Sequence, residues 1–353
     1  MRRRQLTCIL LTLLLLTGCT YSTGGGTDAS EADPEASKSS TEYLEAMDTY
    51  MTLTAYGSHR EEALEEACAE IRRLEALLST GSQDSEVYAL NQSGSAVLSD
   101  DTAALVEYAL RLYDSTGGAF DITVYPLMEL WGFTTQDYQV PTAEALAETL
   151  ALVGSDRLTY DSDSQTLTLA QGQAVDFGGI AKGYTSQRVM ELFLEAGVSS
   201  AMVSLGGNIH CLGTKPDGSL WRIGIQDPFG EDGDIAAVVS VADQAVITSG
   251  GYQRFFQDEE TGKTYHHIID PATGCPAKSG LASVSIVTGD GTLGDGLSTA
   301  LYIMGLEEAT AYWQAHSGEF QAIFIDDDGA IYVTEGIADE VTADAGFTVL
   351  TAE

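Results

Sequence analysis

The chain has 353 residues, with 16 lysines and arginines against 53 aspartates and glutamates, so its formal net charge is −37. Such a charge excludes a nucleic-acid-binding protein, because phosphate backbones must be neutralised by Lys and Arg. With 44% hydrophobic residues and 37 glycines, the composition is typical of a globular, turn-rich protein with a substantial core. Any anionic ligand must therefore be held by local groups.

The first 18 residues have the pattern of a secretory signal peptide. Three arginines precede a leucine-rich run from Leu6 to Leu16, which is too short to span a bilayer. Leu16-Thr17-Gly18-Cys19 resembles a bacterial lipobox, in which Cys19 is lipidated and becomes the mature N-terminus. We therefore expect a lipid anchor on the extracytoplasmic face of the bacterial cell membrane. The alternative is an ordinary cleaved signal with a chance cysteine.

Residues 19–42 are predicted to be a flexible tether that begins at the lipidated cysteine, and the folded domain is expected over 43–353. The tether is rich in Ser, Thr, Gly and Glu without apolar periodicity. Loss of residues 1–18 removes three arginines and no acidic residue, so the net charge changes from −37 to −40. The three cysteines left in the domain, Cys68, Cys211 and Cys275, are odd in number and predict no disulfide framework.

Apolar periodicity predicts helices in both halves of the domain. The first helix follows a capping box, Ser58-His59-Arg60-Glu61, and runs to Leu78. Further helices are expected over 101–114, 142–152, 180–196, 295–304 and 306–316.

Strands are predicted over 201–205, 221–225, 235–241, 264–269, 281–288, 320–325 and 330–334. Most of these short runs neighbour one another, joined by Gly and Asp turns, instead of alternating strictly with helices. This order favours an α+β fold over a doubly wound sheet. We expect one domain, in which two lobes could form, with mixed or antiparallel sheets flanked by helices.

Residues 289–294 read Gly-Asp-Gly-Thr-Leu-Gly and fit G-x-G-x-x-G, the glycine pattern of dinucleotide-binding domains. The match lies near the C-terminus, and no βαβ halves surround it. No acidic residue follows about 20 residues later at the end of a second strand. We therefore interpret the segment as a glycine-rich turn.

Clusters of glycine and polar residues occur at several predicted junctions between strands, loops and helices. Glycine pairs let the backbone approach a ligand closely and leave N–H groups free as donors. In the cluster from Asp176 to Tyr184, Gly178 and Gly179 lead into a helix whose first turn carries Lys182. This arrangement suits a phosphate or a paired carboxylate. A tight turn with a surface lysine is the alternative.

Asp295 and Thr299 are four residues apart at the start of a predicted helix, so the carboxylate and hydroxyl face the same way and could share a hard cation. Oxygen ligands without Cys or His indicate Mg²⁺, whereas the alternative is a helix cap. His266 and His267 lie on alternate faces of a predicted strand. One could be a core residue and the other a base near neutral pH.

Together, these clusters resemble the motifs of the ApbE family, the FAD:protein FMN transferases. The motifs are AFDITVYPL at 119–127, DFGGIAKGY at 176–184, SLGGN at 204–208, TSGGY at 248–252, HHIIDPATG at 266–274 and DGLST at 295–299. The resemblance runs from about Met47 to Gly305. It implies transfer of FMN, through its phosphate, from FAD to a Thr or Ser of a partner protein, with Mg²⁺ as cofactor and AMP as leaving group.

The resemblance also implies roles for individual residues. Asp295, Thr299 and the backbone carbonyl of Gly179 would hold Mg²⁺, with Ser298 a weaker candidate. His267 would be the base that takes the proton from the attacking hydroxyl. Contacts with FAD are implied for Met47, Ala119, Phe120, Asp121, Asp176, Lys182 and Ile269.

Two positions depart from the family's pattern. Gly81 stands where relatives often carry a tyrosine, so an aromatic contact to the ligand would be missing or supplied by Tyr88. Ile122 stands where relatives usually carry a proline. Both departures bear on affinity more than on the type of reaction.

Two other functions remain open: an extracytoplasmic FAD pyrophosphatase that yields FMN and AMP, and a non-catalytic flavin-binding lipoprotein. The intact metal and lysine positions argue against the second. The acceptor implied by the resemblance is a membrane-associated or exported electron-transfer protein.

Overall fold

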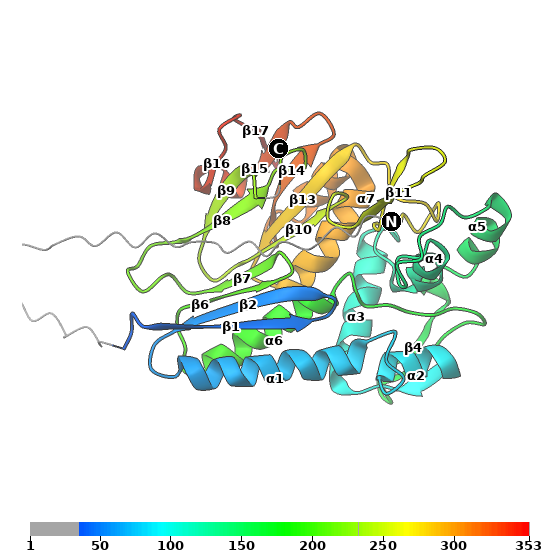
Figure 1. Ribbon diagram of the computed structural model, residues 1–353, viewed down its shortest axis with the longest axis horizontal. Coiled ribbons are helices and arrows are strands. Elements are labelled where there is room, and N and C mark those ends of the chain that lie inside the picture. Colours follow the sequence, from blue (N-terminus) through cyan, green and yellow to red (C-terminus); the bar gives the residue numbers. More distant parts are fainter. Residues whose placement is uncertain (1–34, 232, 353) are drawn as a thin grey trace, which may run out of the picture. The chain divides into compact units, whose positions relative to one another are not determined.

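A nine-stranded sheet lies at the centre of the computed structural model, which describes residues 35–231 and 233–352 (Figure 1). Its strand order is β1-β2-β6-β7-β10-β13-β14-β15-β17, and all neighbours are antiparallel except β15 and β17. The strands are β1 (Ser39–Ala46), β2 (Thr49–Tyr56), β6 (Ala201–Leu205), β7 (Asn208–Leu212), β10 (Ala245–Gly250), β13 (Leu281–Thr288), β14 (Gln321–Asp326), β15 (Ile331–Thr334) and β17 (Thr348–Leu350).

Helices α1 (Arg60–Leu78), α6 (Ala181–Glu195) and α7 (Gly291–Ala315) cover one face of this sheet (Figure 1). The other face is covered by a three-stranded sheet of β16 (Val341–Thr342), β9 (Ile235–Val241) and β8 (Trp221–Gln226). The remaining helices are α2 (Glu86–Ser93), α3 (Asp100–Ser115), α4 (Tyr125–Leu130) and α5 (Ala143–Leu150). The remaining strands are β3 (Ser95–Val97), β5 (Thr166–Thr168) and β4 (Thr159–Asp161) in one small sheet, and β11 (Phe255–Gln257) and β12 (Thr264–His266) in another.

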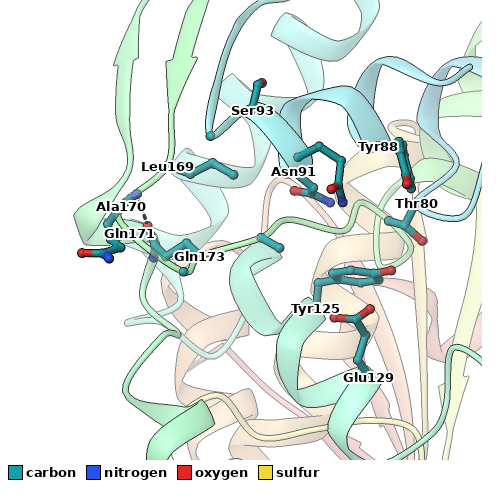
Figure 2. Close-up of a pocket in the computed structure, with 14 residues that line it drawn as sticks. Thr80, Tyr88, Asn91, Ser93, Tyr125, Glu129, Leu169, Ala170, Gln171 and Gln173 are labelled. Atoms are coloured by element: carbon teal, nitrogen blue, oxygen red, sulfur yellow. Dashed lines mark hydrogen bonds between the residues drawn. The ribbon is translucent and has the colours of Figure 1, made fainter. Parts of the chain in front are cut away.

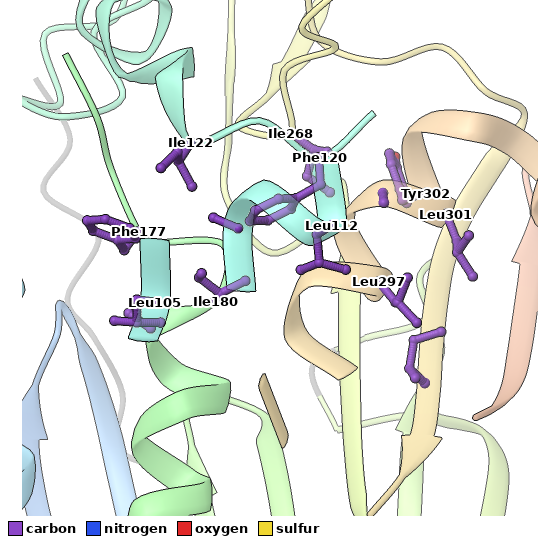
Figure 3. Close-up of a cluster of buried hydrophobic side chains, with 14 of the residues drawn as sticks. Leu105, Leu112, Phe120, Ile122, Phe177, Ile180, Ile268, Leu297, Leu301 and Tyr302 are labelled. Atoms are coloured by element: carbon purple, nitrogen blue, oxygen red, sulfur yellow. The ribbon is translucent and has the colours of Figure 1, made fainter. Parts of the chain in front are cut away.

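Strand β14 carries apolar side chains on both of its faces, one for each covering layer. Ala322 and Phe324 are buried against the helices, whereas Ile323 and Ile325 are buried against the small sheet. This is the period of two that a strand requires, and here both faces are apolar because both are covered. The helical layer continues into a cluster from α3, α7 and the loops between them, part of which is drawn in Figure 3.

The predicted α+β class is confirmed, since antiparallel sheets and helices occupy separate layers. Strands 201–205, 235–241 and 281–288 have the predicted bounds. The two helices predicted around residue 305 are parts of α7, which is interrupted at Gly305, where φ is 79° and ψ is 169°.

Three predictions need correction. The capping box at 58–61 is wrong, because α1 begins after His59 and this N-cap makes no side-chain capping hydrogen bond. The strand predicted over 264–269 ends at His266, and beyond it Ile269 forms only an isolated bridge with Pro276. The domain start at 43 is placed too late, since Ser39 already pairs with Tyr56 in the main sheet.

The glycine pattern at 289–294 forms a helix start. Asp290 is the N-cap of α7, and its Oδ1 accepts a hydrogen bond of 3.0 Å from the N–H of Leu293. A Cβ atom at Gly291 would lie 2.7 Å from the carbonyl oxygen of Gly183, so the glycine allows α6 and α7 to approach closely. The predicted glycine-rich turn is therefore wrong for residues 291–294, which form the first turn of α7, and the almost entirely antiparallel sheet lacks the parallel βαβ units of a dinucleotide-binding domain.

The predicted signal peptide over 1–18, Cys19 and most of the tether lie outside the described residues. Within the described ranges, none of the helices combines the length and apolarity that a membrane span needs. Cys68, Cys211 and Cys275 are all free thiols, in line with the prediction of no disulfide framework.

Candidate active site

The carboxylate of Asp295 is the point where three elements of the fold meet. It lies in the second turn of α7 and is only 4% exposed. Its Oδ2 accepts a hydrogen bond from the N–H of Gly183 in α6 (2.8 Å), and its Oδ1 accepts one from the side-chain amide of Asn208 in β7 (2.9 Å). A Cβ at Gly183 would lie 2.2 Å from the carbonyl oxygen of Gly291, so this contact requires glycine.

Burial makes an uncompensated negative charge on Asp295 unfavourable. Burial raises the pKa of its carboxyl above the usual value, while Lys182 and the hydrogen bond from Gly183 act in the opposite direction. Each carboxylate oxygen accepts one of the hydrogen bonds named above, and each has a further lone pair. A bound cation would use these lone pairs and stabilise the ionised form.

Two more oxygen atoms suit a hard cation. Thr299 follows one turn after Asp295 on α7, and its hydroxyl is 3.3 Å from that of Ser249 in β10. No hydrogen bond to the Gly179 carbonyl occurs among the described residues, because the Gly183 N–H, four residues later, donates to Asp295 instead. Ser298, by contrast, donates its hydroxyl to the carbonyl of Asp295 inside the helix layer.

These donors fit Mg²⁺, which commonly binds to proteins through one or two carboxylates together with substrate phosphates. Among the described residues, no group of three or more His, Cys, Asp and Glu side chains is arranged to hold a metal. A cation at Asp295 would therefore depend on the hydroxyl of Thr299, the carbonyl of Gly179 and oxygens supplied by a ligand.

Asp176 and Lys182 flank the turn that leads into α6. The Oδ1 of Asp176 accepts a hydrogen bond of 2.8 Å from the N–H of Gly178, and the Lys182 ammonium lies 3.5 Å from the Gly178 carbonyl. Burial raises the pKa of Asp176, against the opposing effect of Lys182 and Arg254. Lys182 acts on Asp295 in the same way, so its charge lies close to both carboxylates.

His267 is held as a neutral imidazole. Its backbone N–H donates to the carbonyl of Arg254 (3.0 Å), and its Nδ1 lies 3.2 Å from the same oxygen. Because a carbonyl only accepts, Nδ1 carries the proton and Nε2 keeps its lone pair. Burial, together with the charges of Arg254 and Lys182, lowers the pKa of His267 to about 3.

His266 is held differently from His267, because β12 ends at His266 and His267 lies beyond the strand. Its Nε2 lies 3.0 Å from the carbonyl of Ala277, and its Nδ1 accepts from the N–H of Ile268. Both ring nitrogens are therefore used within the protein. Of the two histidines, His267 is the one with a nitrogen available as a base.

Met47 forms part of the tight turn between β1 and β2. Met47 and Asp48 have positive φ angles of 49° and 58°, which fit a two-residue hairpin turn. The N–H of Met47 donates to Glu75 (2.6 Å), and its sulfur lies 3.8 Å from the hydroxyl of Thr185 in α6. The turn thereby lies beside α6, and the charge of Asp48 acts on Asp176.

The segment 119–121 packs against the turn that leads into α6. Phe120 is buried, and a Cβ at Gly179 would lie 3.0 Å from its ring (Figure 3). Asp121 is also buried, and its carboxylate accepts hydrogen bonds from the backbone and hydroxyl groups of Thr123 and Ser155. Its side chain thus holds two loops together. Ala119 packs on the same core, and Ile269 is buried beside α4.

A cavity of about 460 Å³ lies between α2, α4 and the segment before Asp176 (Figure 2). Tyr88, Tyr125, Thr80 and Glu129 line it. Burial raises the pKa of Tyr125, with smaller contributions from Glu129 and Asp176. The lining also includes Ala174, two residues before Asp176, so the cavity lies next to the site. Gly81 contributes no aromatic ring, and a Cβ added there would have no neighbour within 4 Å. The aromatic side chains that line the cavity are those of Tyr88 and Tyr125.

Sequence reasoning did not assign roles to Asn208, Ser249 or Arg254. Asn208 and Ser249 belong to glycine-rich clusters that the sequence singled out, SLGGN and TSGGY. Only the fold shows that both reach α7, through Asp295 and through Ser298 and Thr299 respectively. Arg254 lies two residues after the second cluster and had no pattern of its own.

The sequence of this chain is similar to those of known proteins. The model of the ApbE family matches residues 47–324. The chain is 37% identical over 305 residues to an FAD:protein FMN transferase of Treponema pallidum (81% of this chain, 83% of the relative). It is 35% identical over 273 residues to one of Haemophilus influenzae (74% and 77%).

Solved structures are similar as well. The ApbE protein from Thermotoga maritima superimposes with a TM-score of 0.80 at 29% identity, covering 86% of this chain and 99% of that protein. The flavin transferase ApbE from Vibrio cholerae gives 0.75 at 30% identity, covering 86% and 100%. The family match and the curated relatives each span most of the described domain, and the chain therefore belongs to the ApbE family.

Proposed function

We propose that this chain transfers FMN from FAD to a hydroxyl group of a partner protein. The observation that carries this proposal is that the charge of Lys182 acts on both Asp295 and His267, in a chain that covers 83% of its transferase relative from Treponema pallidum. The acceptor oxygen forms a bond to the phosphorus next to riboflavin, and the bridging P–O bond to AMP breaks. The proton of the hydroxyl moves to Nε2 of His267.

We further propose Mg²⁺ as the cofactor, held by Asp295, Thr299 and the Gly179 carbonyl. When bound, the ion would offset the charge of the diphosphate and stabilise the departing AMP. Lys182 adds a positive charge from the first turn of α6, where the helix dipole also favours an anion. The cavity beside Tyr88 and Tyr125 would hold one of the ring systems of FAD.

The predicted signal and Cys19 support a further proposal, that a lipid anchor holds the enzyme on the extracytoplasmic face of the cell membrane, near exported or membrane-bound electron-transfer acceptors. Labelled palmitate should enter the full chain and not its Cys19→Ala variant. Equal labelling of the two would refute a lipidated Cys19.

The lowered pKa of His267 gives a testable expectation. Since its folded pKa is about 3 and its unfolded value about 6.5, the folded state binds fewer protons in between. The stability it contributes is complete above pH 6.5 and is lost as the pH falls toward 3. An NMR titration of the imidazole, assigned with His267→Asn, should show no protonation between pH 5 and 8. A midpoint near 6.5 would contradict the assignment of His267 as a buried neutral base.

A further inference from the structure

Arg254 reaches the active site in two ways, through its backbone and through its side chain. Its carbonyl oxygen fixes the imidazole of His267, as described above. Its guanidinium donates a hydrogen bond to the carbonyl of Phe133. The ring of Phe133 in turn meets that of His267 edge-on, with centroids 6.5 Å apart. The guanidinium therefore lies on the same wall of the site as the proposed base.

The positive charge of Arg254 is not used by an ion pair in the part of the chain that the structure describes. The ion pairs found there involve Lys38, Arg60, Arg73 and Arg188. Arg254 is half-buried, so its charge is less well solvated than that of an exposed arginine such as Arg222. A guanidinium buried in this way is stabilised by an anion, and none of the protein's own side chains bonds to it.

Arg254 and Lys182 act on the same groups. Both lower the pKa of Asp176, and both lower that of His267. Two positively charged side chains from distant parts of the sequence thus act on the same region, which lies between the turn before α6 and the residues before β11. A single bound polyanion can satisfy both.

We propose that Arg254 is a substrate-binding residue that contacts the diphosphate of FAD, as the counterpart of the metal site at Asp295. This inference rests on the proposed function. One guanidinium N–H is occupied by Phe133, and the remaining donors are free to bind phosphate oxygens in a paired arrangement. Because charge develops on the leaving phosphate, a fixed guanidinium beside it favours the transition state.

The test compares Arg254→Gln and Arg254→Lys with Arg222→Gln. The control removes one positive charge from an exposed position in β8. Inorganic pyrophosphate is the probe for the diphosphate site, and its inhibition constant is measured in the presence of Mg²⁺ beside the kcat and KM for FAD. Riboflavin, which has no phosphate, is the probe for the rest of the ligand site.

We expect Arg254→Gln to raise the inhibition constant of pyrophosphate and to lower kcat/KM for FAD by roughly 10–100-fold, the size of one charge-assisted interaction. Arg254→Lys should recover part of the loss, and riboflavin inhibition and the unfolding temperature should stay near those of Arg222→Gln. If Arg254→Gln lowers the unfolding temperature while pyrophosphate binds as before, Arg254 only holds the Phe133 segment and the proposal is overturned. The wild-type chain could bind pyrophosphate but transfer no FMN, while Arg254→Gln fails to bind pyrophosphate. That result would refute the transferase function and leave the proposed Arg254 site standing.

Discussion

Asp295→Asn should lower FMN transfer by roughly 10³-fold or more, the scale of several kcal/mol of charge stabilisation by a metal. The substitution removes the single carboxylate of the proposed cation site. It also places an amide where both carboxylate oxygens accept hydrogen bonds, from Gly183 and Asn208. Since an amide offers only one acceptor oxygen, one of these two donors loses its partner.

The measurement is initial rate against Mg²⁺ concentration, with Asp163→Asn as control. Asp163 is exposed, in a turn between β4 and β5, and its substitution should leave the rate unchanged. Circular dichroism should show that Asp295→Asn is folded. Full Mg²⁺-dependent turnover by Asp295→Asn would show that the metal is held elsewhere.

Gly183→Ala is expected to destabilise the protein by about 3 kcal/mol and to reduce activity at the same time. In an ordinary helix interior, replacing glycine by alanine stabilises by about 1 kcal/mol. Here the new Cβ would lie 2.2 Å from the Gly291 carbonyl oxygen and 2.6 Å from the Cβ of Asp295. Both contacts are with rigid parts of α7, so the clash outweighs the gain in helix propensity. Separation of α6 from α7 also breaks the hydrogen bond to Asp295.

Urea unfolding monitored by tryptophan fluorescence measures the first effect. Gly318→Ala is the matched control, because a Cβ at that position meets nothing within 4 Å and its φ is not positive. If Gly183→Ala were as stable and as active as Gly318→Ala, the close approach of the two helices would not be what positions Asp295.

Local signals in the sequence predicted α1, α3, α5, α6 and α7, missed α2 and α4, and predicted the sheets only in part. The periodicity of α1 and α6 reflects burial of one helix face against the sheet. Strands β1 and β2 were not predicted. In β1 the exposed positions Glu42, Tyr43 and Glu45 surround few buried ones, and its burial pattern has no regular alternation. Long-range pairing with β2 forms the strand.

The candidate site was predictable where its chemistry is local. Asp295 and Thr299 occupy one face of one helix, so their spacing alone suggested a shared cation. The partners Asn208 and Ser249 come from strands far away in the sequence, and sheet order decides that they reach α7. The adjacent pair His266 and His267 was visible in the sequence, but neither the end of β12 at His266 nor the carbonyl groups that set the two tautomers could be predicted.

The most direct test of the proposed function is covalent labelling of an acceptor. The full chain is incubated with FAD, a partner protein that carries a flavinylation threonine, and either Mg²⁺ or EDTA. Flavin fluorescence of the denatured acceptor band is then compared with the AMP released. We predict a fluorescent acceptor and equimolar AMP with Mg²⁺, and neither with EDTA. Free FMN and AMP with an unlabelled acceptor would show a pyrophosphatase, and bound flavin without turnover would show a binding protein; either result would contradict the transferase function.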